Sequence, residues 1–125
     1  MPVLATIATI NLLFGSTDDE KVSLLNPDLL RERCEDVLLD AEVRDQAINL
    51  SEYLQQLARD YNTAVLATVE AYRHELEQPD SSATRLIEII ETMDDSRRAA
   101  LTGIVRTRES FRELLTREDW ERVFS

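Results

Sequence analysis

Glycine and proline are scarce in this chain, which has 2 glycines and 3 prolines among its 125 residues. A β-rich fold needs turn residues about every 8–12 positions, and so few glycines and prolines do not supply them. Long helices need few turns. The shortage therefore predicts an all-α fold, and the length corresponds to one domain with a single continuous core.

Cysteine and histidine occur once each, as Cys34 and His74. One cysteine excludes an intramolecular disulfide and any zinc site built from several cysteines. Cys34 lies at helical spacing from Leu30, Val37 and Leu38, which predicts a small buried hydrophobe. The chain also lacks a nucleophile elbow, a phosphate-binding glycine loop and a paired-histidine motif. We expect no enzyme activity and no cofactor.

Positive charge is limited too, since the net charge is −11 and Lys21 is the only lysine among 14 cationic residues. Phosphate repulsion argues against nucleic acid as a partner, and the same balance argues against electrostatic docking on anionic lipid. A protein partner, or a second copy in a homodimer, fits better.

Several features of a helix N-terminus occur together in the stretch LLNPDLLRERCEDVLLD. Asn26 is a capping residue, Pro27 suits the first helical position, and Asp28 places negative charge at the positive end of the helix dipole. The pattern predicts a helix over 27–40 that opens a single helical domain, 26–125. The preceding residues 16–25 are predicted to be a polar linker.

Two long helices follow in the predicted order. The first runs from 43 to about 78 along a heptad seam that indicates a helical neighbour. The second spans 82–115, and a break at Asp94, Asp95 and Ser96 is the alternative to one continuous helix with a possible kink there, which we favour. The first seam comprises Val43, Ala47, Leu50, Leu54, Leu57, Tyr61 and Ala64. The second comprises Leu86, Ile90, Met93, Arg97, Ala100, Ile104, Arg108, Phe111 and Leu115.

These patterns predict a long antiparallel two-helix hairpin. Pro79 ends its first arm. A short C-terminal helix follows Thr116 and carries Trp120, Val123 and Phe124 on one apolar face. Because two helices bury little surface, the flanking helices or a second copy must cover the apolar faces, which gives a helical bundle.

A metal site is one candidate for function. Glu70, His74 and Glu77 fall on one side of the first long helix, where they could hold a divalent metal. A solvated charged face explains the same residues, because metal sites in bundles draw ligands from several helices.

A partner-binding surface is the other candidate. Arg97 and Arg108 occupy seam positions, where arginine either extends along the apolar surface or pairs with a carboxylate across the hairpin. With Arg112 they belong to the one basic stretch of the chain, and Trp120 follows it. A groove that binds an acidic group of a partner is the functional interpretation.

The helix, the long hairpin and the pair Leu115–Thr116 in LLTREDW are similar to the small periplasmic helical proteins of the Spy/CpxP type. Asp119 stands where that family has Gln. The resemblance implies an envelope-associated, ATP-independent chaperone or a related metal-responsive sensor.

The N-terminal segment 1–15 is almost uninterruptedly apolar over residues 3–14. It is shorter than the 20 or so residues of a transmembrane helix. Three alternatives stay open: a truncated or atypical signal peptide or anchor, a buried helix, and an interfacial segment. The first favours a periplasmic or envelope location. We therefore expect a non-catalytic helical protein-binding or assembly module, with a metal-responsive sensor or a membrane-tethered regulatory protein as the alternative.

Overall fold

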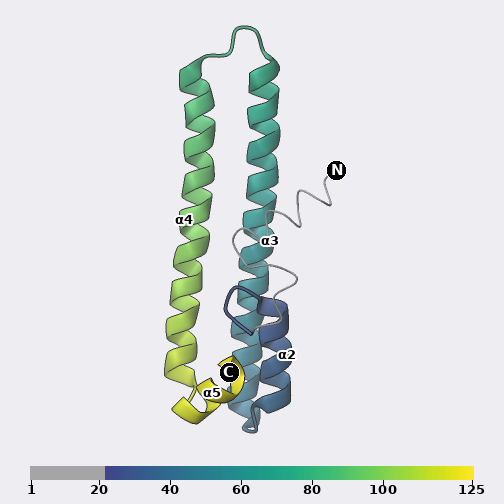
Figure 1. Ribbon diagram of the computed structural model, residues 1–125, viewed down its shortest axis with the longest axis vertical. Coiled ribbons are helices and arrows are strands. Elements are labelled where there is room, and N and C mark those ends of the chain that lie inside the picture. The colour runs from purple at the N-terminus through teal and green to yellow at the C-terminus, as the bar shows by residue number, and fades with distance from the viewer. Residues whose placement is uncertain (1–21) are drawn as a thin grey trace.

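The computed structural model describes residues 22–125, which form four helices and no strand. The helices are α2 (Pro27–Val37), α3 (Ala41–Glu77), α4 (Ala83–Leu114) and α5 (Arg117–Phe124). Figure 1 shows α3 and α4 side by side as a long antiparallel hairpin, with α2 and α5 at the end away from its tip. The predicted all-α hairpin with a shorter preceding helix and a short C-terminal helix is confirmed.

Each helix begins at a side chain that accepts a hydrogen bond from a backbone N–H of the first turn. These caps are Asn26, Asp40, Ser82 and Thr116. The first helix ends at Val37, three residues before the predicted end, because the following backbone is extended and Asp40 already caps the next helix.

Both arms of the hairpin are unbroken. With 37 and 32 residues, α3 and α4 are about 55 and 48 Å long. The helix continues through Asp94 and Asp95, and Ser96 donates its hydroxyl to the carbonyl of Thr92 at 3.2 Å instead of capping a new helix. The prediction of one continuous helix is confirmed.

The contact stripe of α3 differs in part from the predicted seam. Ala47 and Leu54 are buried as expected, but Ser51 and Ala58 are buried where the seam placed Leu50 and Leu57, which are only half-buried. Small side chains at these positions let the backbone of α3 approach the neighbouring helices. The Ser51 hydroxyl donates a hydrogen bond within α3, to the carbonyl of Ala47 at 2.9 Å.

The contact stripe of α4 differs from the predicted seam. Arg97 and Arg108 were predicted on the contact stripe, yet both are exposed, and Gly103 and Thr107 are buried instead. A Cβ on Gly103 would lie 2.7 Å from Cδ1 of Leu57, so the absence of a side chain at this glycine leaves room for Leu57 between the helices. Bulky, charged arginines would not fit at this separation.

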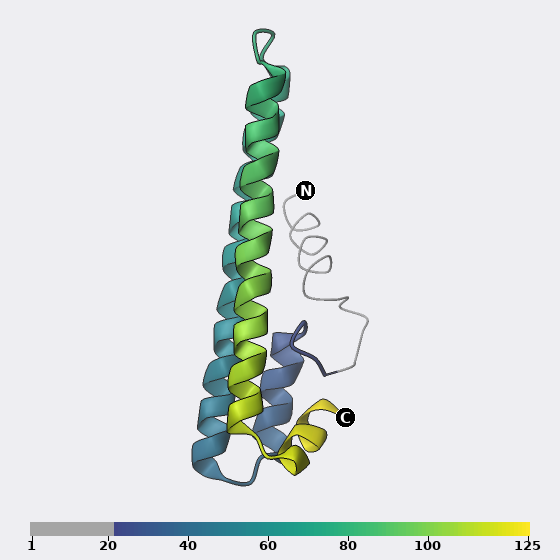
Figure 2. The same ribbon diagram turned by 90° about the vertical axis from the view of Figure 1, so that its left-hand side faces the viewer.

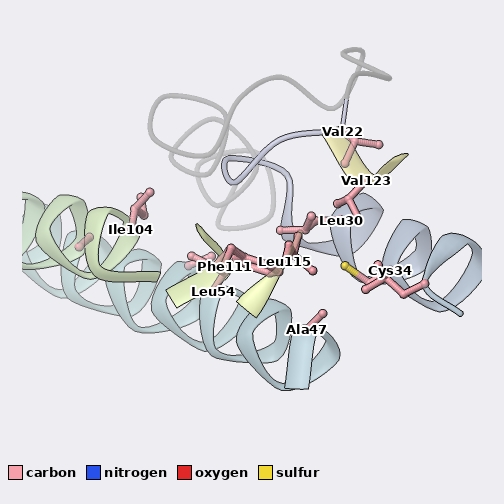
Figure 3. Close-up of a cluster of buried hydrophobic side chains, with 12 residues drawn as sticks. Val22, Leu30, Cys34, Ala47, Leu54, Ile104, Phe111, Leu115 and Val123 are labelled. Carbon is pink, nitrogen blue, oxygen red and sulfur yellow. The ribbon is translucent and has the colours of Figure 1, made fainter. Parts of the chain in front are cut away.

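The core occupies the base of the hairpin, where all four helices meet (Figure 3). Its fully buried members are Phe111, Leu30, Leu54, Val123, Cys34 and Ala47. α5 is attached through aromatic contacts: the ring of Phe124 packs edge-on against Phe111, with centroids 6.0 Å apart.

The chain enters this core before α2. Val22 is a buried member of the cluster, so the predicted polar linker 16–25 contributes a residue to the core. The apolar segment 1–15, with its signal, anchor or buried-helix alternatives, lies outside the described residues.

Candidate functional site

The upper half of the hairpin is the part of the described structure that lacks a third helix. We call it the distal arm: residues 62–77 of α3, the turn 78–82 and residues 83–93 of α4. Figures 1 and 2 show α2 and α5 packed near the base while the arm extends well beyond them. Whatever apolar surface the arm carries is therefore uncovered by the other described helices.

An apolar groove runs between the two helices of the arm. Its volume is about 300 Å³, and it is lined by Thr68, Val69, Tyr72, Ile89, Ile90 and Met93. None of these side chains is charged, and this set is called the arm groove below.

Large apolar side chains are exposed along and beyond the groove. Val69 is 49% and Ile90 48% exposed, and towards the tip Leu76 and Ile87 are more than half exposed. Scattered apolar residues are ordinary on a protein surface, but a contiguous patch around a groove marks an interaction site.

The arm groove opens on the same side of α3 as α2. Gln55 of α3 donates to Asp28 of α2 at 2.7 Å, which places Gln55 on the side that α2 covers. Asn62, Val69 and Leu76 follow it at intervals of seven residues and so share that side. The helix α2 therefore covers the lower part of a stripe whose upper part contains the groove.

The predicted metal residues do not form a metal-binding group. Among residues 22–125, no three His, Cys, Asp or Glu side chains are arranged to hold a metal ion. Glu70 pairs with Arg73, while His74 and Glu77 are exposed to solvent near the hairpin tip. These three positions therefore fit the solvated charged face, which was the alternative interpretation of the sequence.

The four predicted partner-binding residues are only partly brought together. Arg108 lies over the ring of Trp120, 5.9 Å from its centroid, and Arg108 and Arg112 both contact Glu109, at 2.8 and 3.9 Å. Arg97 is exposed higher on α4. The stacked Arg108 helps to hold α5 against α4, so its described contacts are structural.

Cys34 is unsuited to nucleophilic chemistry. Burial raises the pKa of its thiol to about 11, although a hydrogen bond with Ser51 lowers it in part, and Glu35 adds to the rise. Because the thiolate is the reactive species, a buried thiol of high pKa is inert. This agrees with the small buried hydrophobe predicted from its spacing.

A second hollow lies at the base, with a volume of about 520 Å³. It is lined by Gln46, Asn49, Leu50, Ser110, Glu113 and Leu114. Glu113 is its one ionisable side chain, so the lining offers no acid–base pair. The arm groove is the stronger candidate, and sequence reasoning missed it because a heptad pattern shows that a helix has a neighbour but not how many.

Comparison with known proteins finds no matching family model, no matching curated protein and no matching solved structure. Within residues 22–125, no helix is both long and apolar enough to cross a membrane. The arm groove is therefore identified as a candidate site from its geometry alone.

Proposed function

We propose that this protein is a non-catalytic helical module that binds other proteins through the arm groove, with a chaperone-like preference for exposed apolar segments. The observation that carries the proposal is the uncharged groove on a two-helix arm, bordered by the half-exposed side chains of Val69 and Ile90. Grooves of this kind receive the apolar face of a helix or of an extended segment.

The energetics favour weak and reversible capture. Burying one leucine-sized side chain contributes about 1.5–3 kcal/mol. Association costs about 4–15 kcal/mol in lost freedom, so a groove of this size needs several apolar contacts from its partner. Partners with clustered apolar residues, such as unfolded chains, meet this requirement. The net charge of −11 keeps the module soluble while its apolar surface is exposed.

The experiment measures whether the purified protein suppresses aggregation of an unfolded client at near-stoichiometric amounts. Ile90→Asp places a charge in the groove, and we expect it to abolish suppression. Val105→Asp is the matched control, because Val105 lies on the same helix, is 59% exposed and does not line the groove. Equal suppression by both variants, or none by the wild-type protein in excess, contradicts the proposal.

The resemblance to Spy/CpxP-type proteins supports a chaperone-like form of this function. Assembly with a second copy of the chain is the other form, and sedimentation across protein concentrations separates the two. The metal-responsive sensor and the membrane-tethered regulator stay predictions from the sequence.

A further inference from the structure

One polar atom beside the arm groove has no hydrogen-bond partner among residues 22–125. Oδ1 of Asn62 is buried and accepts no hydrogen bond from the described part of the chain. Asn62 lies between the level of α2 and the groove, on the stripe defined by Gln55 and Val69. A buried carbonyl oxygen without a donor is unfavourable, so a donor from a further segment would improve this region.

The N-terminal part of the chain departs close to this point. The helix α2 begins next to Gln55, since Asp28 in its first turn accepts the hydrogen bond from that side chain. The described chain starts at Val22, just before this helix. The described chain therefore begins on the side of the hairpin on which the groove opens, and at the lower end of the groove.

Residues 15–21 are long enough to connect the start of the described chain to the arm groove. From Gln55 to Val69 the helix rises about 21 Å over fourteen residues. Residues 15–21 span at most about 23–25 Å when extended, which reaches the groove. They also contain the charged run Asp18, Asp19, Glu20 and Lys21, which suits a solvated connection.

The chemistry of residues 3–14 matches the groove. These residues carry no charged side chain, and neither does the groove lining. Val3, Ile7, Ile10 and Phe14 recur at spacings of 4, 3 and 4, which is the seam pattern of a helix packed along another helix. The segment also offers the side-chain amide of Asn11 as a donor for Oδ1 of Asn62.

We infer that residues 3–14 of the same chain dock in the arm groove and continue the stripe that α2 covers at the base. Docking occupies the surface that partners use, so the segment competes with them. This competition rests on the proposed function, whereas the docking itself does not.

Thiol labelling tests the docking in the full-length chain. A cysteine is introduced at Ile90 in one variant, Ile90→Cys, and at the control position in another, Val105→Cys, and each is labelled with a maleimide. The native Cys34 is buried and its thiol has a pKa of about 11, so it reacts slowly in both. Each variant is also made with Ile7→Asp and Ile10→Asp, which place charge on the docking stripe.

We expect Cys at position 90 to react at least about tenfold more slowly than Cys at position 105, because a covered side chain reacts only from the opened state. Without docking the two positions are similarly exposed and react at similar rates. The double Asp substitution should bring the two rates together, and the protection should be independent of protein concentration.

Three results would overturn the inference. They are equal labelling at both positions in the unaltered segment, protection that persists with Ile7→Asp and Ile10→Asp, and protection that appears only at high protein concentration, which would assign the groove to a second copy. Equal labelling together with client suppression overturns the docking alone. Protection in the unaltered chain, with no suppression even when Ile7→Asp and Ile10→Asp uncover the groove, contradicts the proposed function alone.

Discussion

The contact between Gly103 and Leu57 gives a prediction that can be worked out from distances. An alanine Cβ at position 103 would lie 2.7 Å from Cδ1 and 3.1 Å from Cδ2 of Leu57. Favourable carbon–carbon separations are about 3.5–4.0 Å, so the Leu57 side chain must move. It is half-buried and flexible at its end, which places the overpacking cost near the low end of about 1–3 kcal/mol.

Two effects of Gly103→Ala oppose each other. Alanine is favoured over glycine in a helix interior by about 1 kcal/mol, which offsets the overpacking. We therefore expect the free energy of unfolding to change by less than about 1 kcal/mol when Leu57 is present. In a Leu57→Ala background the contact is absent, and Gly103→Ala should stabilise by about 1 kcal/mol.

Urea denaturation followed by circular dichroism measures this double-mutant cycle. The expected coupling between the two positions is about 1–2 kcal/mol, with unchanged m-values. Thr102→Ala is the control partner, because Thr102 is exposed one residue away and should be additive with Leu57→Ala within about 0.3–0.5 kcal/mol. A Gly103–Leu57 coupling as small as that control would refute the close approach of the two helices.

Three further outcomes are expected. Phe111→Ala removes a fully buried ring from the base and should cost about 3–5 kcal/mol of unfolding free energy, whereas Ile87→Ala on the exposed arm should cost less than about 1 kcal/mol, and similar losses in urea denaturation would contradict the location of the core. The pKa of Cys34 is raised from 9.0 to about 11, so the folded state retains this proton more tightly than the unfolded state; the stability it contributes is complete below pH 9 and is lost as the pH rises through about 11. The stability difference between wild type and Cys34→Ala should therefore shrink by up to about 2–3 kcal/mol over that range, and a difference independent of pH would contradict it. Since Glu70 pairs with Arg73 and His74 is exposed, we expect zinc titration calorimetry to give the same result for His74→Ala as for wild type, and a loss of binding in the variant would restore the metal site.

The sequence predicts the helices well because their ends are specified locally. Asn26, Ser82 and Thr116 are capping residues, and each accepts a hydrogen bond from a backbone N–H of its own first turn. Asp94 and Asp95 do not interrupt α4, because exposed aspartates in a long helix lose little by remaining helical.

The contact faces were harder to predict because small residues determine them. Ser51 and Gly103 lie in the contact between helices, yet neither is recognised in a pattern of large apolar residues. Arg97 and Arg108 fit the heptad spacing and are nevertheless exposed, because the α4 contact runs through Gly103 and Thr107. The arm groove is uncovered because α2 reaches only part of the way along α3. This is a matter of tertiary packing, which no local sequence pattern specifies.

The central claim is that the arm groove is a protein-binding surface. The most direct measurement is the Kd for a permanently unfolded, carboxymethylated test protein, obtained by fluorescence anisotropy for wild type, Ile90→Asp and Val105→Asp. We predict that Ile90→Asp weakens binding at least about tenfold, equivalent to about 1.4 kcal/mol, while Val105→Asp leaves the Kd within about twofold of wild type. Equal affinities for all three proteins would contradict the claim.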